Sequence, residues 1–294
     1  MVERLIETWG NSNPHNKIFG LSRSFLAMGT LLTLTFNDIQ PLFSKFNHGN
    51  IETSFGLVNV SLFSFFDNLI IPYSLSILVL VTVIIGYRPR ITGILHWYIS
   101  FSYMMSSAVI DGGDHLTAIL TGLFIPVCVL DNRKWHWINT EHKQKKVTHN
   151  LVSNSALFMI KLQMCIMYFH AFTSKLSISE WVNGTVLYYW LEHPLFGLSN
   201  WMAPFIMPIS INPFGVVLMT WGALLIEIML FVALFASASW RPILLVTAIL
   251  FHSLIIVFFG LLSFFLAVLG GLVIYLGPIK SGSFNNYFRT ENYD

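Results

Sequence analysis

Residues 242–276 have the sequence PILLVTAILFHSLIIVFFGLLSFFLAVLGGLVIYL, a run of 35 residues without a charged side chain. As a single helix this run would be about 52 Å long, whereas the hydrocarbon core of a bilayer is about 30 Å thick. One straight helix therefore does not fit, and we predict that the chain turns back near Phe259–Gly260 and crosses the membrane twice.

Six more runs are apolar and long enough to span a bilayer, at 18–37, 68–86, 91–110, 114–130, 151–173 and 214–238. The sequence thus predicts an all-α polytopic membrane protein with about eight transmembrane helices. The composition agrees, because 55% of the residues are hydrophobic and 10% are charged, against about 25% charged in soluble domains. This balance excludes a soluble domain, a disordered chain, a nucleic-acid-binding protein and a disulfide-rich secreted scaffold.

The Lys and Arg residues predict the orientation, since cytoplasmic loops carry the excess of both. With the N-terminus inside, twelve of the sixteen lie in the cytoplasm: Arg4, Lys17, Arg88, Arg90, Arg133, Lys134, Lys143, Lys145, Lys146, Arg241, Lys280 and Arg289. Lys45 and Lys175 then lie outside. We predict a single membrane domain over 1–294 in a bacterial-type plasma membrane, with cytoplasmic ends at 1–17 and 279–294.

Two long segments, 38–67 and 174–213, are predicted to lie outside the cell. The second, between spans five and six, is rich in Trp, Tyr and Phe, which favour the headgroup layer. We expect a short interfacial helix near 180–192 with a loop after it; a solvated connector is the alternative. The basic loop 133–146 is interpreted as an orientation signal that contacts anionic lipid, or as a docking surface for a partner.

Four ionisable residues within predicted spans stand out: Arg23, Lys161, Glu227 and His252. Such a group costs about 2.5–3.5 kcal/mol at the centre of a span and usually pairs inside the bundle. Lys161, Glu227 and His252 are expected at similar depth on consecutive spans. A Lys161–Glu227 pair with His252 nearby is therefore predicted, either as part of a site or as a network that fixes helix packing.

Lys161, Tyr168 and Lys175 are seven residues apart, so they follow one helix face with a drift of about 20° per step. This face would form a polar track that ends at the outer side with Lys175. A lysine in an apolar pocket can lose its proton near neutral pH and act as a base or nucleophile. The alternative is a lysine that extends from the helix end to water.

Asp111-Gly112-Gly113-Asp114-His115 is predicted to form the outer turn between spans three and four. Two glycines suit a tight turn, and the acidic residues suit the start of the next helix. Helix capping by Asp111 is favoured over a metal site, because the spacing matches no strong metal motif.

Several strings of residues, taken together, resemble the HTTM-domain family, whose membrane domain is shared with vitamin K-dependent γ-carboxylase. The strings are Asn13-Pro14 with Gly20-Leu21-Ser22-Arg23-Ser24, Gly86-Tyr87-Arg88-Pro89-Arg90 with His96-Trp97-Tyr98, Asp111-Gly112-Gly113-Asp114, Lys161-Leu162-Gln163 with Tyr168, Lys175-Leu176 with Trp181-Val182-Asn183-Gly184-Thr185, Glu227, and Phe251-His252. The resemblance covers nearly the whole chain and is strongest to members of the sporulation-delaying B type.

The resemblance implies a role in maturing a secreted antimicrobial peptide, with the toxin precursor and a sporulation-delaying protein A-like protein as partners. It implies that Lys175 is the catalytic base and that Asp114 or His115 falls near a catalytic histidine. Trp181 and Gly184, and Tyr188 in the same aromatic segment, would contact substrate or the interface. The carboxylase further implies a quinone-type lipid cofactor, although no residue of the sequence identifies a cofactor.

Two functions stay open at this point. The first is a membrane-embedded enzyme or enzyme subunit that modifies or processes a peptide at the outer face, with Lys175, Asp114 and His115 as catalytic residues. Lys161, Glu227, His252, Tyr168 and Arg23 would then form its supporting network. The second is a non-catalytic scaffold, peptide exporter or immunity protein.

Overall fold

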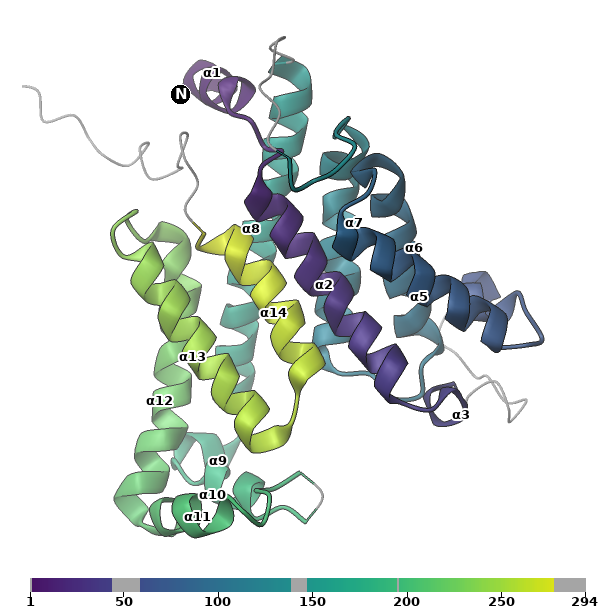
Figure 1. Ribbon diagram of the computed structural model, residues 1–294. Helices are drawn as coiled ribbons and strands as arrows, with labels where there is room; N and C mark the ends of the chain where they lie inside the picture. The colour runs from purple at the N-terminus through teal and green to yellow at the C-terminus, as the bar shows by residue number, and fades with distance from the viewer. Residues whose placement is uncertain (1, 44–58, 139–146, 195, 278–294) are drawn as a thin grey trace, which may run out of the picture. The chain divides into compact units, whose positions relative to one another are not determined.

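A computed structural model describes residues 2–43, 59–138, 147–194 and 196–277, and these segments are helical with short connections (Figure 1). The helices are α1 (Val2–Asn11), α2 (Lys17–Phe36), α3 (Ile39–Leu42), η2 (Leu62–Ser64), α5 (Ile70–Ile85), α6 (Pro89–Ser106), α7 (Gly112–Val129), α8 (Val147–Lys175), α9 (Ser179–Val182), α10 (Val186–Leu191), α11 (Ala203–Ile211), α12 (Pro213–Val232), η3 (Ala233–Phe235), α13 (Arg241–Phe259) and α14 (Leu262–Tyr275). Lys45, the 139–146 part of the basic loop and the tail 279–294 lie outside the described residues.

Each of the eight predicted apolar runs forms a helix. Among the described residues, α2, α7, α8, α12 with η3, and α13 are long and apolar enough to cross a membrane. Helices α5 and α14 are apolar but have only 16 and 14 residues. The structure therefore agrees with an all-α membrane protein, while the count of eight spans and the side of each terminus stay predictions.

The predicted turn in the long apolar run lies where it was expected. Helix α13 ends at Phe259, and Gly260 follows with a φ of 72°, a left-handed conformation that glycine adopts without strain. Helix α14 then begins at Leu262.

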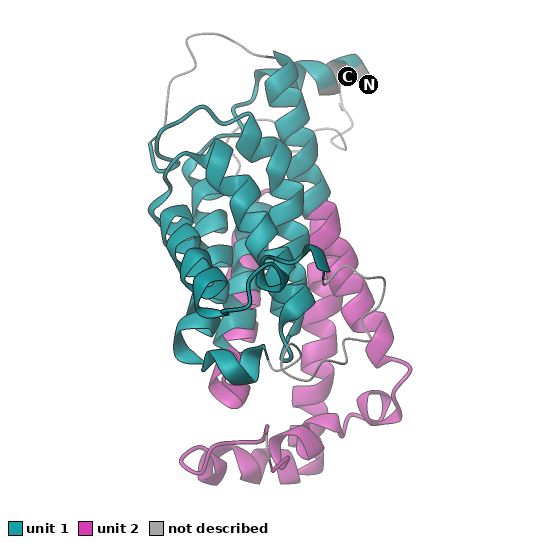
Figure 2. Cartoon of the chain, turned by 90° about the vertical axis from the view of Figure 1, so that its right-hand side faces the viewer, with its two compact units in different colours: residues 1–160, 262–274 teal, residues 161–261, 275–294 magenta. Residues whose placement is uncertain are grey.

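The chain divides into two compact units, which Figure 2 colours separately. Unit 1 comprises Met1–Ile160 and Leu262–Ile274, and unit 2 comprises Lys161–Leu261 and Tyr275–Asp294. Helices α8 and α14 each contribute to both units.

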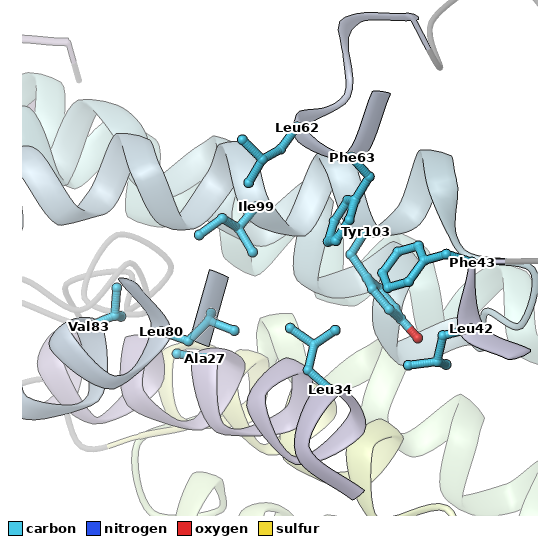
Figure 3. Close-up of a cluster of buried hydrophobic side chains, with 10 residues drawn as sticks. All are labelled: Ala27, Leu34, Leu42, Phe43, Leu62, Phe63, Leu80, Val83, Ile99 and Tyr103. Carbon is cyan, nitrogen blue, oxygen red and sulfur yellow. The ribbon is translucent and has the colours of Figure 1, made fainter. Parts of the chain in front are cut away.

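Unit 1 is organised around a hydrophobic cluster between α2, α5 and α6, closed at one end by α3 and η2 (Figure 3). Its members are Ala27, Leu34, Leu42, Phe43, Leu62, Phe63, Leu80, Val83, Ile99 and Tyr103. Phe43 stacks on Phe63 with ring centroids 4.1 Å apart. The two short elements beyond the helix ends are thus held by aromatic packing.

In unit 1, α14 packs closely on α2 because small residues line the contact. Ser22 donates a hydrogen bond of 2.6 Å to the carbonyl of Gly270, and a Cβ on Gly29 would lie 3.1 Å from the carbonyl oxygen of Ser263. Small residues and hydroxyl groups are the usual means by which helices associate in lipid, where apolar surface alone gives no preference for a neighbouring helix.

Unit 2 contains the aromatic segment between α8 and α12. The expectation of one helix near 180–192 is wrong, because two short helices, α9 and α10, occupy this range. Gly184 breaks the helix with a φ of 76°, and a Cβ there would lie 3.0 Å from Val217 Cγ2 of α12. A third helix, α11, follows before α12 begins.

Candidate functional site

An ion pair in unit 2 joins the end of α8 to the C-terminal half of α12. Lys175, the last residue of α8, donates from Nζ to Glu227 Oε1 at 2.6 Å and to the Ala171 carbonyl at 3.1 Å. The Lys175 side chain is 23% exposed and that of Glu227 is 9% exposed. Lys175 is therefore neither free in solvent nor sealed inside the unit.

An indole ring covers the same ammonium group. Lys175 Nζ lies 5.2 Å from the ring centroid of Trp181, and a cation over an aromatic face is attracted to it. Trp181 is buried in a cluster with Val186 and Leu224, against which Phe172, Leu187 and Ala223 pack. Trp181, which was predicted to contact substrate or the interface, thus lies directly against Lys175.

The turn at Gly184 fixes the position of Trp181. Trp221 of α12 donates from Nε1 to the Val182 carbonyl at 3.2 Å, and Gly184 leaves room for Val217 and Trp221. These contacts hold α9 against α12. Tyr188, by contrast, is half-buried, and a hydrogen bond with the Glu192 side chain raises its pKa. No contact in the described chain joins Tyr188 to the ion pair.

Tyr168 and His252 lie against each other on α8 and α13. Their ring centroids are 6.1 Å apart at an interplanar angle of 68°, and His252 Nδ1 lies 2.8 Å from the Ala248 carbonyl oxygen. The Tyr168 hydroxyl and Glu227 Oε2 are buried polar atoms without a hydrogen-bond partner in the described part of the chain. Such atoms mark places that a water molecule or a ligand group can occupy.

The predicted pairing of Lys161 with Glu227 is wrong, since Glu227 pairs with Lys175. The prediction assumed that the middles of consecutive spans lie level. Glu227 of α12 instead lies level with the end of α8, where it accepts a hydrogen bond from Lys175. Lys161, about 21 Å earlier along α8, is partly buried and makes no hydrogen bond or ion pair within the described residues.

Asp111 and Asp114 form a capping box at the start of α7, which confirms helix capping by Asp111. Asp111 Oδ1 accepts from the Asp114 amide at 3.0 Å, and Asp114 Oδ2 accepts from the Asp111 amide at 2.9 Å. Gly112 and Gly113 do not form the turn itself but the first turn of α7. A Cβ on Gly113 would lie 2.7 Å from the Phe264 backbone, so close packing explains this glycine.

The capping box gives the Asp114 carboxylate a structural task, while the neighbouring His115 is exposed. Both residues belong to unit 1, whereas Lys175 belongs to unit 2. A catalytic role for Asp114 or His115 stays a prediction.

Arg23 also belongs to unit 1 and has its own partners there. Its guanidinium lies 3.3 Å from His136 Nδ1, donates to Thr92 Oγ1 at 3.0 Å and lies 5.7 Å from the centroid of the Phe19 ring. Burial, and then the charges of Arg23 and Arg133, lower the pKa of His136 to about 3, so its ring is a neutral acceptor. The sequence interpretation missed His136, which follows the helix end at Val129 without any spacing signal.

The described residues include no group of three or more His, Cys, Asp and Glu side chains that could hold a metal ion. They also offer no set of side chains that selects a quinone-type lipid over another apolar ligand. The site in unit 2 therefore consists of a sheltered ammonium and its carboxylate under an indole ring, with a buried phenol and imidazole nearby.

Comparison with known proteins gives one family and two curated relatives. The family model described as the HTTM domain matches residues 16–278. The uncharacterized protein YitO of Bacillus subtilis (strain 168) is 37% identical over 292 residues, which cover 98% of this chain and 94% of that protein. The sporulation-delaying protein SdpB of the same organism is 34% identical over 290 residues, 97% of this chain and 88% of that protein. No solved structure matches.

Proposed function

The chain belongs to the HTTM-domain family, and we propose that it is a membrane-embedded factor for the maturation of a secreted antimicrobial peptide of the sporulation-delaying type. The likeness to the sporulation-delaying protein SdpB along nearly the whole chain supports this proposal. The protein would act as a multi-pass protein of the cell membrane. Its partners would be the toxin precursor and a sporulation-delaying protein A-like protein.

The proposed chemistry assigns Lys175 as the base or nucleophile that acts on the precursor at the outer face. One proton separates the resting ion pair from the reactive form, because transfer from Lys175 Nζ to Glu227 Oε1 leaves a neutral amine and a neutral acid. The neutral amine can then take a proton from the precursor, or attack a peptide carbonyl carbon; in the second case the peptide C–N bond breaks and the protonated Glu227 gives its proton to the leaving amine.

The observation that carries this proposal is the short Lys175–Glu227 contact beneath the Trp181 ring. It places a proton acceptor directly on the lysine, as an activated amine requires. The amine is also partly accessible to a substrate, because 23% of the Lys175 side chain is exposed.

Two substitutions of one residue test the proposal. The protein is expressed with the precursor and the A-like partner, and intact mass and peptide yield are measured. Lys175→Met and Lys175→Arg should both reduce mature peptide by at least about 100-fold, because methionine has no amine and the arginine guanidinium keeps its proton. The amount of each variant in the membrane is measured in parallel and should equal that of the wild type.

The alternative is a non-catalytic scaffold, exporter or immunity protein, and the same ion pair is the observation in its favour. An ion pair under an indole ring also holds α8, α9 and α12 together without any chemistry. In that case Lys175→Arg keeps the positive charge and restores peptide maturation, while Lys175→Met does not. Restoration by arginine would therefore contradict catalysis by Lys175.

A further inference from the structure

A second polar surface lies in unit 1, where the chain passes from α5 to α6 and leaves α7. Helix α5 ends at Gly86, with a φ of 89°, and Arg88 has a φ of 39° before Pro89 begins α6. Tyr87 forms an antiparallel bridge with Trp135 of the segment after α7. The Arg88 amide donates to the Lys134 carbonyl at 2.8 Å, so the two connections run side by side.

Buried polar contacts beneath this surface make it rigid. Arg133 forms an ion pair of 2.7 Å with Asp131 and donates to the His136 carbonyl at 2.9 Å. The His136 ring fills the space left by two glycines: a Cβ on Gly20 would lie 2.9 Å from it, and a Cβ on Gly86 would overlap it. The His136 amide in turn donates to the Gly86 carbonyl at 3.0 Å.

The outward side of the bridge carries aromatic rings and positive charges. The rings of Tyr87 and Trp135 are 5.1 Å apart between centroids, and the cations of Arg88 and Lys134 lie 5.9 Å and 6.0 Å from the Tyr87 and Trp135 centroids, respectively. Arg90 donates to Asn132 Oδ1 at 3.4 Å beside them. Arg88, Arg90 and Lys134 are exposed, and none forms an ion pair within the described residues.

We propose that this surface, made of Tyr87, Arg88, Arg90, Lys134 and Trp135, binds the phosphate group of an anionic phospholipid. Arg and Lys side chains supply several charge-assisted hydrogen bonds to phosphate oxygens. Trp and Tyr are the residues that settle at the headgroup level of a bilayer. A lipid is favoured over a soluble anion because the surface lies at the end of α7, a helix long and apolar enough to cross a membrane, beside the ends of α5 and α6.

The rigid base makes this a site and not a diffuse patch. The backbone bridge and the packed His136 ring fix the two rings and the chain beneath the cations before any lipid binds, which reduces the entropy lost on binding. Each basic residue near an anionic membrane surface strengthens binding by about five-fold. We therefore expect a strong dependence on individual residues of this surface.

The test measures phosphatidylglycerol retained by the purified full-length protein, by native mass spectrometry after titration with this lipid. Lys134→Gln and Arg90→Gln should each reduce retention by about five-fold. The control for total charge is Lys17→Gln, which also removes one exposed positive charge, at the start of α2 and outside the five residues of this surface, and should reduce retention less than Lys134→Gln does. The Lys134→Arg variant should retain as much phosphatidylglycerol as the wild type. Thermal unfolding shows whether each variant is folded.

Three results would overturn the proposal. Equal losses for Lys17→Gln and Lys134→Gln would show that total charge, and not this surface, attracts the lipid. Equal retention of phosphatidylcholine would show that the phosphate of an anionic lipid is not selected. Displacement of phosphatidylglycerol by inorganic phosphate at equal concentration would identify a soluble anion as the ligand.

Discussion

At the scale of single residues, two charges buried in apolar helices are stabilised in different ways. Glu227 is neutralised by the ammonium of Lys175, while Arg23 has no carboxylate partner among the described residues. The Arg23 charge is instead spread over a neutral imidazole, a hydroxyl group and the face of Phe19. Arginine keeps its proton in proteins, so neutral acceptors and an aromatic face are its remaining source of stabilisation.

The Lys175–Glu227 pair predicts energetic coupling between two residues that are 52 positions apart in sequence. In a double-mutant cycle of Lys175→Met and Glu227→Gln, the two losses of unfolding free energy should not add. We expect a coupling energy of about 1–3 kcal/mol, reduced from the fully buried case because Lys175 is partly exposed. The measurement is equilibrium unfolding of the purified protein in detergent micelles.

The control is a second double-mutant cycle, which substitutes Lys161, the other lysine of α8, and leaves Lys175 unchanged. Lys161→Met and Glu227→Gln should add to within about 0.5 kcal/mol, because Lys161 does not contact Glu227. Coupling in the Lys161 cycle and additivity in the Lys175 cycle would show that the sequence-based pairing was correct and the observed one is not.

At the scale of elements, glycine decides how closely helices of unit 1 approach one another. Gly113 and Gly112 are neighbours in the first turn of α7, but only Gly113 lies against a backbone. A Cβ on Gly113 would lie 2.7 Å from Phe264 Cα of α14, whereas one on Gly112 would make ordinary contact with the Phe264 ring at 3.5 Å. The two positions form a natural pair for an experiment.

Gly113→Ala should destabilise the protein by about 1–3 kcal/mol, because a backbone cannot move aside as a side chain can. Gly112→Ala should be neutral or stabilising by up to about 1 kcal/mol, since alanine favours a helix. Unfolding in detergent with both variants measures the difference. Equal effects of the two substitutions would mean that α7 and α14 do not approach each other as described.

At the scale of the whole chain, the sequence predicted the eight apolar helices, but neither the short helices between α8 and α12 nor how charged side chains pair. The apolar runs and their breaks are local signals: Gly260 ends α13 and Asn212 caps α12, each within a few residues of the run that it terminates. The partner of Glu227 depends on how far α12 is displaced along α8. Three short helices lie between α8 and α12 along the chain, and the hydrophobic pattern contains no information about the displacement.

The same distinction explains the results for the other candidate residues. Asp111 was recognised as a cap because its partner is three residues away. His136 was missed because its contacts with Arg23, Gly20 and Gly86 are far away in sequence and involve no repeated spacing. Local chemistry is visible in a single sequence, whereas contacts between elements require the packed structure.

Helix α14 is the shortest of the eight helices in the predicted topology of eight crossings: it is about 21 Å long, against a hydrocarbon core of about 30 Å. Three variants each carry one new cysteine, in place of an exposed residue in a connection between helices. Ser177 lies between α8 and α9, Ala238 between η3 and α13, and Leu261 between α13 and α14. A membrane-impermeant maleimide should label Ser177→Cys and Leu261→Cys in intact cells, but Ala238→Cys only after permeabilisation. Wild-type protein is the control, because Cys128 and Cys165 are buried. Labelling of Ala238→Cys in intact cells, or protection of Leu261→Cys, would contradict the alternation of α12, α13 and α14 across the membrane.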